Sequence, residues 1–350
     1  MTGTPSISRD LLRRIPKAEL HCHLDGSVRP QTLLDLAAEY GKPMPRADAT
    51  SLAAYMLARD SHNLEEYLAR FSVTLSVMQT ASALERIAYE LATDAAADGV
   101  RYIEVRYAPI LNVREGLSLG DAVEAPLRGL ARAEHDTGIV GRLIICGLRT
   151  MPPSVSMELA ELAVAYAKRG VVAFDLAGGE AGHSAAAHRQ AFAHAHAHHL
   201  PCTCHAGEGD GPSSVREALQ ACCADRVGHG TRIIEDAVLL DDVIRRQVPI
   251  EVCLTSNVQT HAAASYDAHP LREFYDRGVN VVLNTDNRLM SGTTLTDEYE
   301  HAAAHLRFTF DELSRVALNG FQSAFLPDDQ RNALVAAAER ELATLRRAIA

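Results

Sequence analysis

Long apolar runs and an excess of basic residues are both missing from this 350-residue sequence. No stretch approaches the roughly 20 apolar residues that a membrane-spanning helix needs. Lysine and arginine total 34 against 45 aspartate and glutamate residues, which gives a net charge of −11. Because nucleic acids and anionic membranes attract basic surfaces, we expect neither as a partner. No long apolar run follows Arg13 and Arg14, so we expect no signal peptide.

Cysteines are few and have no regular spacing. The sequence contains seven, an odd number that does not suggest a disulfide framework. Five of them lie inside apolar, strand-like runs: Cys22, Cys146, Cys202, Cys204 and Cys253. We therefore expect reduced, buried thiols and a cytoplasmic protein.

Several motifs of metal and phosphate sites are also absent. There is no H-E-x-x-H, which argues against a zincin-type protease. The P-C-x-x-C element of the cytidine deaminase class is missing, because Cys202 and Cys204 are too closely spaced. The glycines of residues 207–211 match neither a P-loop nor a dinucleotide fingerprint. His194 and His198 are one helical turn apart and could bind metal, but without an acidic partner we expect a solvated helix face.

Short apolar runs alternate with amphipathic segments along the chain. Strands with two buried faces are typical of parallel sheets, and eight of them, mostly followed by helical patterns, predict an α/β fold of the (β/α)8 TIM-barrel type. An open α/β sheet is the alternative. The predicted strands are residues 19–24, 100–107, 141–148, 170–176, 201–205, 226–229, 249–254 and 279–284. The predicted helices are residues 84–97, 120–135, 156–168, 237–246 and, at the C-terminal end, 311–319 and 328–349.

The predicted barrel takes up residues 1–350 as one domain with additions. A TIM barrel needs about 250 residues, so this length leaves room for insertions. Helical patterns at residues 30–40 and 63–78 separate the first two strands. They predict a helical insertion at about residues 30–80 that lies over the barrel mouth.

Unusual polar residues fall where the predicted strands end. His21 and His23 end the first strand, His205 ends the fifth and His229 the sixth. Asp286 follows the eighth. Because the carboxyl ends of all strands of such a barrel open on one face, we expect these side chains to converge there.

The converging residues predict a site for a divalent cation. Alternate residues share one face of a strand, so the imidazoles of His21 and His23 can both point inward. Buried imidazoles need partners, and three of them with a carboxylate suit zinc best, with iron, cobalt or manganese as alternatives. Hydrogen-bonded core histidines are the competing interpretation. Glu208 follows His205 by three residues, and it either returns over the mouth or lies solvated near a helix start.

With these residues in place, the sequence resembles the adenosine deaminase family of the amidohydrolase superfamily from about Pro16 to Phe325. Single motifs of the family would be modest evidence, but six occur here in order at the strand ends. The motifs are residues 16–27 (PKAELHCHLDGS), 102–109 (YIEVRYAP), 175–178 (DLAG), 205–208 (HAGE), 226–230 (RVGHG) and 284–286 (NTD).

The resemblance implies a metal-assisted hydrolysis that replaces the 6-amino group of adenosine or deoxyadenosine with oxygen from water. Glu208 looks like the proton donor to purine N1, and His229 looks like the residue that orients the attacking oxygen. Asp286 could also accept a proton from the attacking water. The resemblance implies one zinc ion per chain, held by His21, His23, His205 and Asp286.

The resemblance also implies contacts with a purine nucleoside, while it leaves the oligomeric state open. Asp25 looks like the partner of a ribose hydroxyl, and the backbone of Gly178 looks like a donor to purine N3. Tyr67, Leu68 and Phe71 lie at positions that resemble an apolar lid over the nucleoside.

One position departs from the family. Many members carry a second carboxylate directly after the ligand aspartate, facing purine N7, whereas this chain has Asn287. An amide NH2 can donate to N7, so the change is compatible with binding. It leaves open a 5′-modified adenosine, such as aminofutalosine, or adenine itself as the substrate.

Two other classes of function remain as alternatives. A different metal hydrolase on the same barrel is disfavoured, because no lysine ends the fourth strand to bridge a second metal. A non-catalytic homologue that keeps a structural zinc is disfavoured by the presence of both Glu208 and His229.

Overall fold

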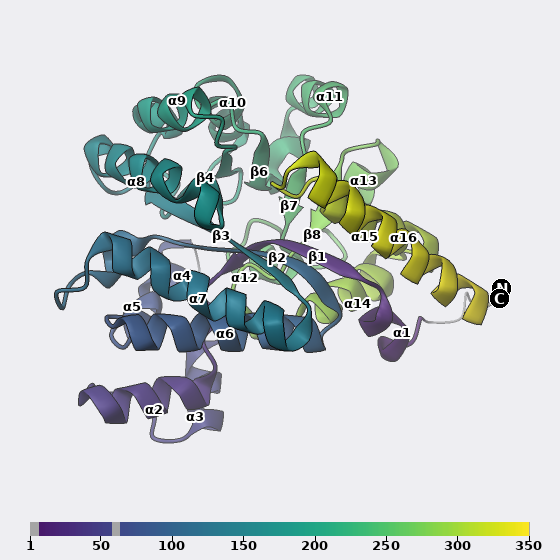
Figure 1. Cartoon of the computed structure of the whole chain (residues 1–350). Helices are drawn as coiled ribbons and strands as arrows, with labels where there is room; N and C mark the ends of the chain where they lie inside the picture. The colour runs from purple at the N-terminus through teal and green to yellow at the C-terminus, as the bar shows by residue number, and fades with distance from the viewer. Residues whose placement is uncertain (1–6, 58–63, 350) are drawn as a thin grey trace.

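Eight parallel strands form the centre of the computed structural model, which describes residues 7–57 and 64–349 (Figure 1). They pair in chain order as two four-stranded sheets, β1 to β4 and β5 to β8. The strands are β1 (Lys17–His23), β2 (Val100–Tyr107), β3 (Val140–Leu148), β4 (Val171–Ala177), β5 (Thr203–Ala206), β6 (Arg226–His229), β7 (Ile250–Val252) and β8 (Val281–Leu283).

Two further parallel bridges join the sheets into a ring. Cys22 of β1 pairs with Asp286, which follows β8, and the backbone N–H of Asp286 donates to the carbonyl of His21 (3.0 Å). On the other side, Phe174 of β4 pairs with Cys202, which precedes β5. The strands therefore follow one another around a barrel, which confirms the predicted (β/α)8 fold over the open sheet.

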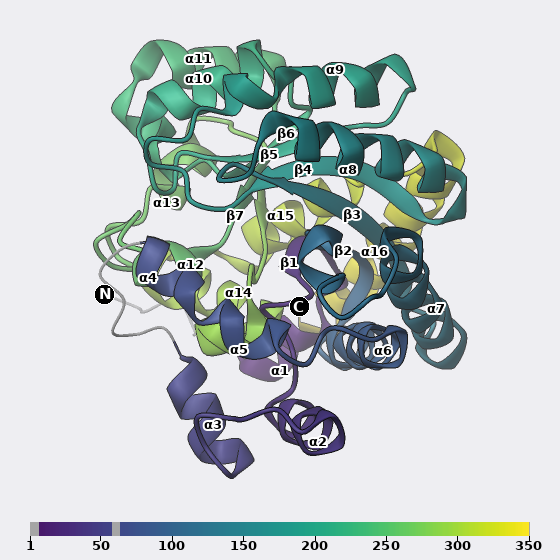
Figure 2. The ribbon, with the colours of Figure 1, turned by 90° about the vertical axis from the view of Figure 1, so that its left-hand side faces the viewer.

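Helices cover the outside of this barrel in both views (Figures 1 and 2). They include each helix predicted outside the insertion at residues 30–80, and the observed ends differ from the predicted ends by a few residues. The α-helices are α1 (Arg9–Arg14), α2 (Pro30–Tyr40), α3 (Ala49–Met56), α4 (Leu64–Ala69), α5 (Phe71–Leu75), α6 (Ala81–Ala97), α7 (Leu119–Thr137), α8 (Pro153–Tyr166), α9 (Arg189–Ala197), α10 (Pro212–Gln220), α11 (Ala237–Arg246), α12 (Leu254–Gln259), α13 (Leu271–Asp276), α14 (Leu295–Leu306), α15 (Phe310–Gln322) and α16 (Asp328–Ile349).

Helices α2 to α5 make up the insertion between β1 and α6. Figure 1 shows α2 and α3 projecting away from the barrel, while α4 and α5 lie nearer the strand ends. The helix predicted at residues 63–78 was wrong in extent: residue 63 lies outside the described residues, and the rest forms two short helices. They are separated at Arg70, whose N–H bonds to the carbonyl of Tyr67, three residues back rather than four (3.4 Å).

The end of α15 covers the amino ends of the strands. Gly320 of α15 packs against Ala18 and Val282, and an added Cβ would lie 3.1 Å from the Cβ of Ala18. Glycine at this position therefore lets the helix approach β1 and β8 closely. Just beyond α15, the ring of Phe325 lies 3.5 Å from the guanidinium carbon of Arg226, at the start of β6.

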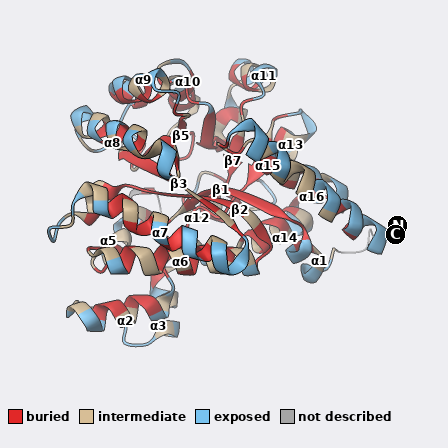
Figure 3. Ribbon diagram, viewed as in Figure 1, coloured by how far each residue is buried: buried red, intermediate tan, exposed pale blue. Residues whose placement is uncertain are grey.

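Burial follows the layers (Figure 3). The strands are buried along most of their length, while the helices alternate between buried inner faces and exposed outer faces. Within the described residues, no helix combines the length and apolarity that crossing a bilayer requires. With the amino ends of the strands covered by α15, the carboxyl ends remain as the face on which a site can form.

Candidate metal centre

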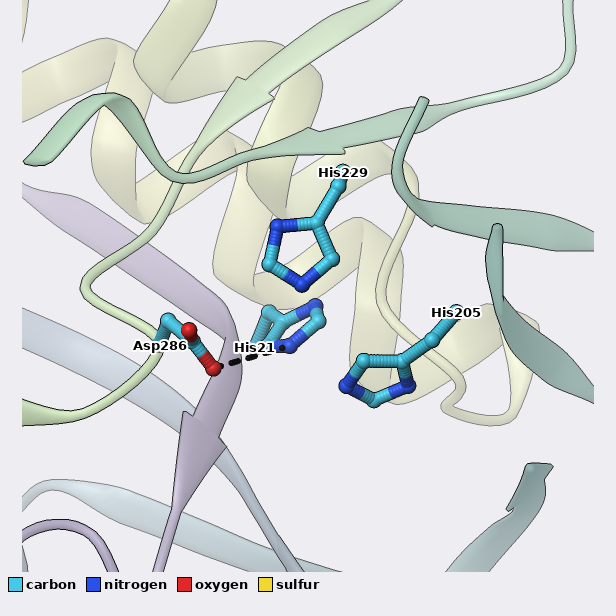
Figure 4. A group of neighbouring side chains, drawn as sticks. All are labelled: His21, His205, His229 and Asp286. Carbon is cyan, nitrogen blue, oxygen red and sulfur yellow. Dashed lines mark ion pairs between the residues drawn. The ribbon is translucent and has the colours of Figure 1, made fainter. Parts of the chain in front are cut away.

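Four side chains from distant parts of the sequence meet at the carboxyl ends of the strands (Figure 4). His21 lies in β1, His205 in β5 and His229 at the end of β6, while Asp286 follows β8. One ligand atom from each lies within 4.8 Å of the others, and all four residues are buried.

His23 completes this group, which we call the mouth cluster. Its Nε2 atom lies 3.0 Å from Nε2 of His205 and 3.4 Å from Oδ1 of Asp286. Nε2 of His21 lies 3.3 Å from the same oxygen. The ring nitrogens of three strand-end histidines thus point at one carboxylate oxygen or at each other, as the ligands of a shared ion do.

Two members of the mouth cluster have strained backbones. His229 has φ of 62° and Asp286 has φ of 61°, in the left-handed region that L-residues other than glycine seldom adopt. Such conformations cost about 1–3 kcal/mol and gather at functional sites, where the rest of the fold holds them. This backbone conformation occurs in the last residue of β6 and just beyond the end of β8, where each side chain turns toward the cluster.

A second layer of buried charges orients the imidazole rings. Nδ1 of His21 lies 2.9 Å from Oε2 of Glu251, and Nδ1 of His205 lies 3.0 Å from Oδ2 of Asp175. Arg106 donates to both carboxylates, at 3.1 Å to Asp175 and 2.9 Å to Glu251. A carboxylate behind a histidine fixes the ring and leaves its other nitrogen free for a metal ion, a pattern common around metal ligands.

The protonation of the mouth cluster suits a cation. Burial favours the protonated form of Asp286, but the interaction with His21 foremost outweighs burial and holds its pKa well below the usual value. Burial alone would lower the pKa of His21, but the carboxylates of Asp286 and Glu251 outweigh it and raise the pKa. Burial lowers the pKa of the other imidazoles and keeps them neutral at pH 7: His23, His205 and His229.

Donor set and charge both fit a divalent ion. The buried Nε2 of His21 makes no hydrogen bond, because its contact with Asp286 lacks hydrogen-bond geometry. With its imidazoles counted as neutral, the buried network that reaches this nitrogen holds two arginines against four carboxylates, an excess of two negative charges. Its members are Arg106, Arg226, Glu104, Glu251, Asp175 and Asp286. A divalent cation would use the orphaned nitrogen and balance this charge.

Glu208 faces the mouth cluster from the loop after β5. Its Oε2 atom lies 3.4 Å from Nε2 of His229. The carboxylate of buried Glu180 accepts three successive backbone N–H groups of that loop, from Gly207 (2.6 Å), Glu208 (3.0 Å) and Gly209 (2.7 Å). This anchor fixes the loop, so that Glu208 is directed over the mouth rather than solvated.

Helix α12 begins directly behind the mouth cluster. Ser256 donates from Oγ to Oδ2 of Asp286 (2.7 Å), and the side-chain amide of Asn257 contacts Nδ1 of His229 (2.9 Å). The preceding residue, Thr255, donates its backbone N–H to buried Glu298 (3.1 Å). Three consecutive residues of α12 therefore connect the cluster to the rest of the fold.

A pocket of about 490 Å³ opens beside His23. Asp25 and Gly178 line it from the strand ends, and Leu68 and Phe71 line it from α4 and α5. This volume lies in the range of small-molecule sites. A wider surface hollow of about 620 Å³, near Arg272, is lined by no residue of the mouth cluster.

The two remaining residues expected to contact a nucleoside do not line this pocket. Tyr67 is buried, and its hydroxyl lies 3.0 Å from Oγ of Ser291. Asn287 is buried against Gly26. A Cβ atom added to Gly26 would lie 1.7 Å from Oδ1 of the Asn287 side chain. That Oδ1 atom makes no hydrogen bond.

Sequence reasoning missed the residues behind the mouth cluster. Arg106 and Glu251 carried a usable signal, because charged residues inside apolar strands must find buried partners. Ser256 and Asn257 carried none, since polar side chains at the start of a helix are ordinary caps. Glu180 also carried no signal in the sequence, because its hydrogen-bond partners are backbone groups.

Comparison with known proteins shows which family this chain resembles. The family model described as adenosine deaminase matches residues 16–340. The chain is 43% identical over 342 residues to an adenosine deaminase of Mycobacteroides abscessus, covering 93% of this chain and 94% of that one. It is 41% identical over 322 residues to a probable adenosine deaminase of Dictyostelium discoideum, covering 91% of this chain but only 42% of that longer protein.

Solved structures show the same fold. An adenine deaminase of Arthrobacter aurescens matches with a TM-score of 0.87 at 28% identity, over 93% of this chain and 98% of that one. An amidohydrolase of Burkholderia ambifaria with bound Zn matches with a TM-score of 0.88 at 28% identity, over 99% and 96%. The Arabidopsis protein ADAL, in complex with IMP, matches with a TM-score of 0.85 at 26% identity, over 96% and 99%.

Proposed function

The chain belongs to the adenosine deaminase family, and from that premise we propose which of its residues perform the reaction. It is a hydrolase that replaces the 6-amino group of adenosine with oxygen from water, giving inosine and ammonia. The observation that carries the assignment is the buried mouth cluster with Glu208 beside it. Each role below is assigned to a residue of this chain by its position in that cluster.

Three imidazoles and one carboxylate would hold one zinc ion. The orphaned Nε2 of His21 and the excess of two buried negative charges support this assignment. A bound zinc ion would lower the pKa of a water molecule to about 7 and so supply a strong nucleophile at neutral pH. The ligands are His21, His23, His205 and Asp286. The Zn in the Burkholderia ambifaria structure supports zinc over other divalent metals.

Glu208 donates a proton to N1 of the purine. Protonation of N1 makes C6 electron-poor, so that water can add there. The support is the position of the carboxyl group over the mouth, within 3.4 Å of His229, on a loop anchored by Glu180. A general acid of this kind contributes about 10²–10⁴-fold to the rate.

Asp286 and His229 act on the attacking water. Asp286 accepts a proton from it, which the low pKa of this carboxylate allows only transiently. His229 orients the oxygen and stabilises its charge, and its position opposite Glu208 supports that role.

The pocket beside His23 binds the nucleoside. Asp25 accepts a hydrogen bond from a ribose hydroxyl, and the backbone N–H of Gly178 donates to purine N3. Leu68 and Phe71 cover the bound molecule. All four residues line the same pocket, which supports the assignment.

Asn287 and Tyr67 act at the edge of the substrate. The amide NH2 of Asn287 donates to purine N7, and the Oδ1 atom, packed against Gly26, is left without a partner. Tyr67 of α4 covers the edge of the site, and the contact of its hydroxyl with Ser291 holds it there. In this account residues 30–80 are a lid on a single barrel domain, and α4 and α5 are the part that meets the ligand.

The partner is a purine nucleoside, and the enzyme works in the cytoplasm. Seven free cysteines, six of them buried, support a reducing compartment. Adenosine is favoured by the names of the relatives at about 40% identity. The test is the ultraviolet change on deamination of adenosine, deoxyadenosine, a 5′-modified adenosine and adenine, with metal analysis of the same sample. Highest kcat/KM with adenosine and one zinc per chain are expected; turnover of adenine alone would overturn the nucleoside assignment.

A further inference from the structure

A line of hydrogen bonds runs from the mouth cluster to the backbone of α13. The Nδ1 atom of His229 lies 2.9 Å from Nδ2 of Asn257, and Oδ1 of the same amide lies 3.1 Å from Nε2 of His269. Nδ1 of His269 accepts from the backbone N–H of Leu271 (3.0 Å). All four residues are buried, so no bulk water competes for these groups.

The direction of every bond in this line follows from the last one. A backbone N–H can only donate, so Nδ1 of His269 is an acceptor. Burial lowers the pKa of His269 to about 3, so the ring is neutral and its single proton is on Nε2. That N–H donates to the oxygen of Asn257, which also accepts from Oγ1 of Thr231 (3.0 Å).

With its oxygen facing two donors, the amide of Asn257 must turn its NH2 group toward His229. Nδ1 of His229 is then an acceptor, and the proton of this neutral ring is on Nε2. We infer that Asn257 and His269 are positioning residues that hold His229 as the Nε2–H tautomer, an inference that rests on the role proposed for His229.

The same reasoning separates this histidine from the proposed ligands. His21 and His205 have carboxylates behind Nδ1, from Glu251 and Asp175, which accept a hydrogen bond from Nδ1–H and leave an Nε2 lone pair for a metal ion. His229 has an amide NH2 behind Nδ1 and presents an N–H instead. It therefore donates a hydrogen bond to the attacking oxygen and is neither a metal ligand nor a general base.

The direct test reads the tautomer in the zinc-loaded enzyme. Two-bond ¹H–¹⁵N correlation spectra of protein labelled with ¹⁵N-histidine distinguish Nε2–H from Nδ1–H rings, and His229→Gln identifies the signals of His229. We expect the Nε2–H pattern. An Nδ1–H pattern would overturn the inference. The spectrum needs no turnover, so its outcome is independent of whether the enzyme deaminates adenosine.

A pair of variants tests the line itself. Asn257→Asp replaces the donor behind His229 with an acceptor of the same size, so we expect His229 to change to Nδ1–H and kcat to fall about 10²–10³-fold, as when a charge-stabilising donor is lost. Thr231→Val removes one bond to the same amide oxygen without changing the direction of the line. It should keep the Nε2–H pattern and lower kcat less than about tenfold. Equal losses in both variants, or an unchanged spectrum in Asn257→Asp, would contradict the inference.

Discussion

The barrel holds two neighbouring layers of buried ionisable residues, and only in the deeper one do arginines of the chain pair with the carboxylates. In the interior layer, Arg226 pairs with Glu104 and, at 2.7 Å, with Glu251, while Arg106 pairs with Glu251 and Asp175. In the mouth cluster, the ion-pair contacts of Asp286 within the described residues are with imidazoles alone.

The difference separates what the fold needs from what the reaction needs. Each interior carboxylate accepts a hydrogen bond from an arginine, so removal of one charge leaves an uncompensated partner and should cost stability. The mouth cluster has strained backbones and an orphaned nitrogen, so a loaded ion should matter there more than any protein partner. Substitutions in the two layers should therefore fail in different ways.

The largest effect is expected from loss of a mouth ligand. His205→Gln removes one of the proposed ligands, so zinc content should fall well below one per chain and deamination should drop below detection. The metal-free variant should unfold at nearly the same temperature as metal-free wild type, because the arginine–carboxylate pairs of the interior layer are intact. Metal analysis and thermal unfolding measure both. A variant with full zinc content would show that His205 does not bind the ion.

Glu208→Gln should have the next largest effect. The amide cannot give the proton to N1, so kcat should fall by about 10²–10⁴-fold. Zinc content should stay at one per chain, since Glu208 is outside the proposed ligand set. Steady-state kinetics with metal analysis of the same sample tests this; a loss of zinc together with activity would move Glu208 into the metal site.

Glu251→Gln sharpens the comparison, because Glu251 belongs to the interior layer but touches His21. Loss of the carboxylate behind the ligand should weaken zinc binding about 10–100-fold. Glu104→Gln is the matched control, since Glu104 pairs with Arg226 and contacts no imidazole. Competition with a chelator should show weakened zinc binding in Glu251→Gln alone. Equal weakening of zinc binding in both variants would mean that contact with His21 is not what matters, and would contradict the separation of the two layers.

The smallest effect on turnover is expected for Glu298→Gln, behind α12. Burial raises the pKa of Glu298 to about 7, above the value of 4.5 for the unfolded chain. The folded protein therefore holds this proton more tightly, and the stabilisation is lost as pH rises through 7. The unfolding free energy of wild type relative to Glu298→Gln should fall by about 2 kcal/mol between pH 5 and pH 7. Urea unfolding of both zinc-loaded proteins measures it, and a difference independent of pH would contradict it.

Sequence patterns predicted the barrel well, because its strands are short apolar runs at regular intervals. They also predicted that His21, His205 and Asp286 would converge, since parallel strands of a closed barrel end on one face. The ends of β7 and β8 were placed one or two residues too far out. The break between α4 and α5 depends on one turn that periodicity does not report.

The sequence did not reveal the hydrogen bonds that determine which ring nitrogen of a histidine carries the proton. Asn257 and His269 act through hydrogen-bond direction, and the bonds from Asn257 to His229 and to His269 join residues more than ten positions apart, so no local pattern reports them. Whether His229 binds a metal ion or donates a hydrogen bond could therefore not be read from its motif. The same holds for Glu180, whose partners are three backbone amides.

The central claim is that one divalent ion completes the charge of the mouth cluster. Crystals of the zinc-loaded enzyme, with anomalous diffraction recorded at the zinc edge, test it most directly. We expect one peak, about 2.0–2.2 Å from Nε2 of His21, His23 and His205 and from a carboxylate oxygen of Asp286, with His229 outside bonding distance. A peak elsewhere, or none at full zinc loading, would contradict it.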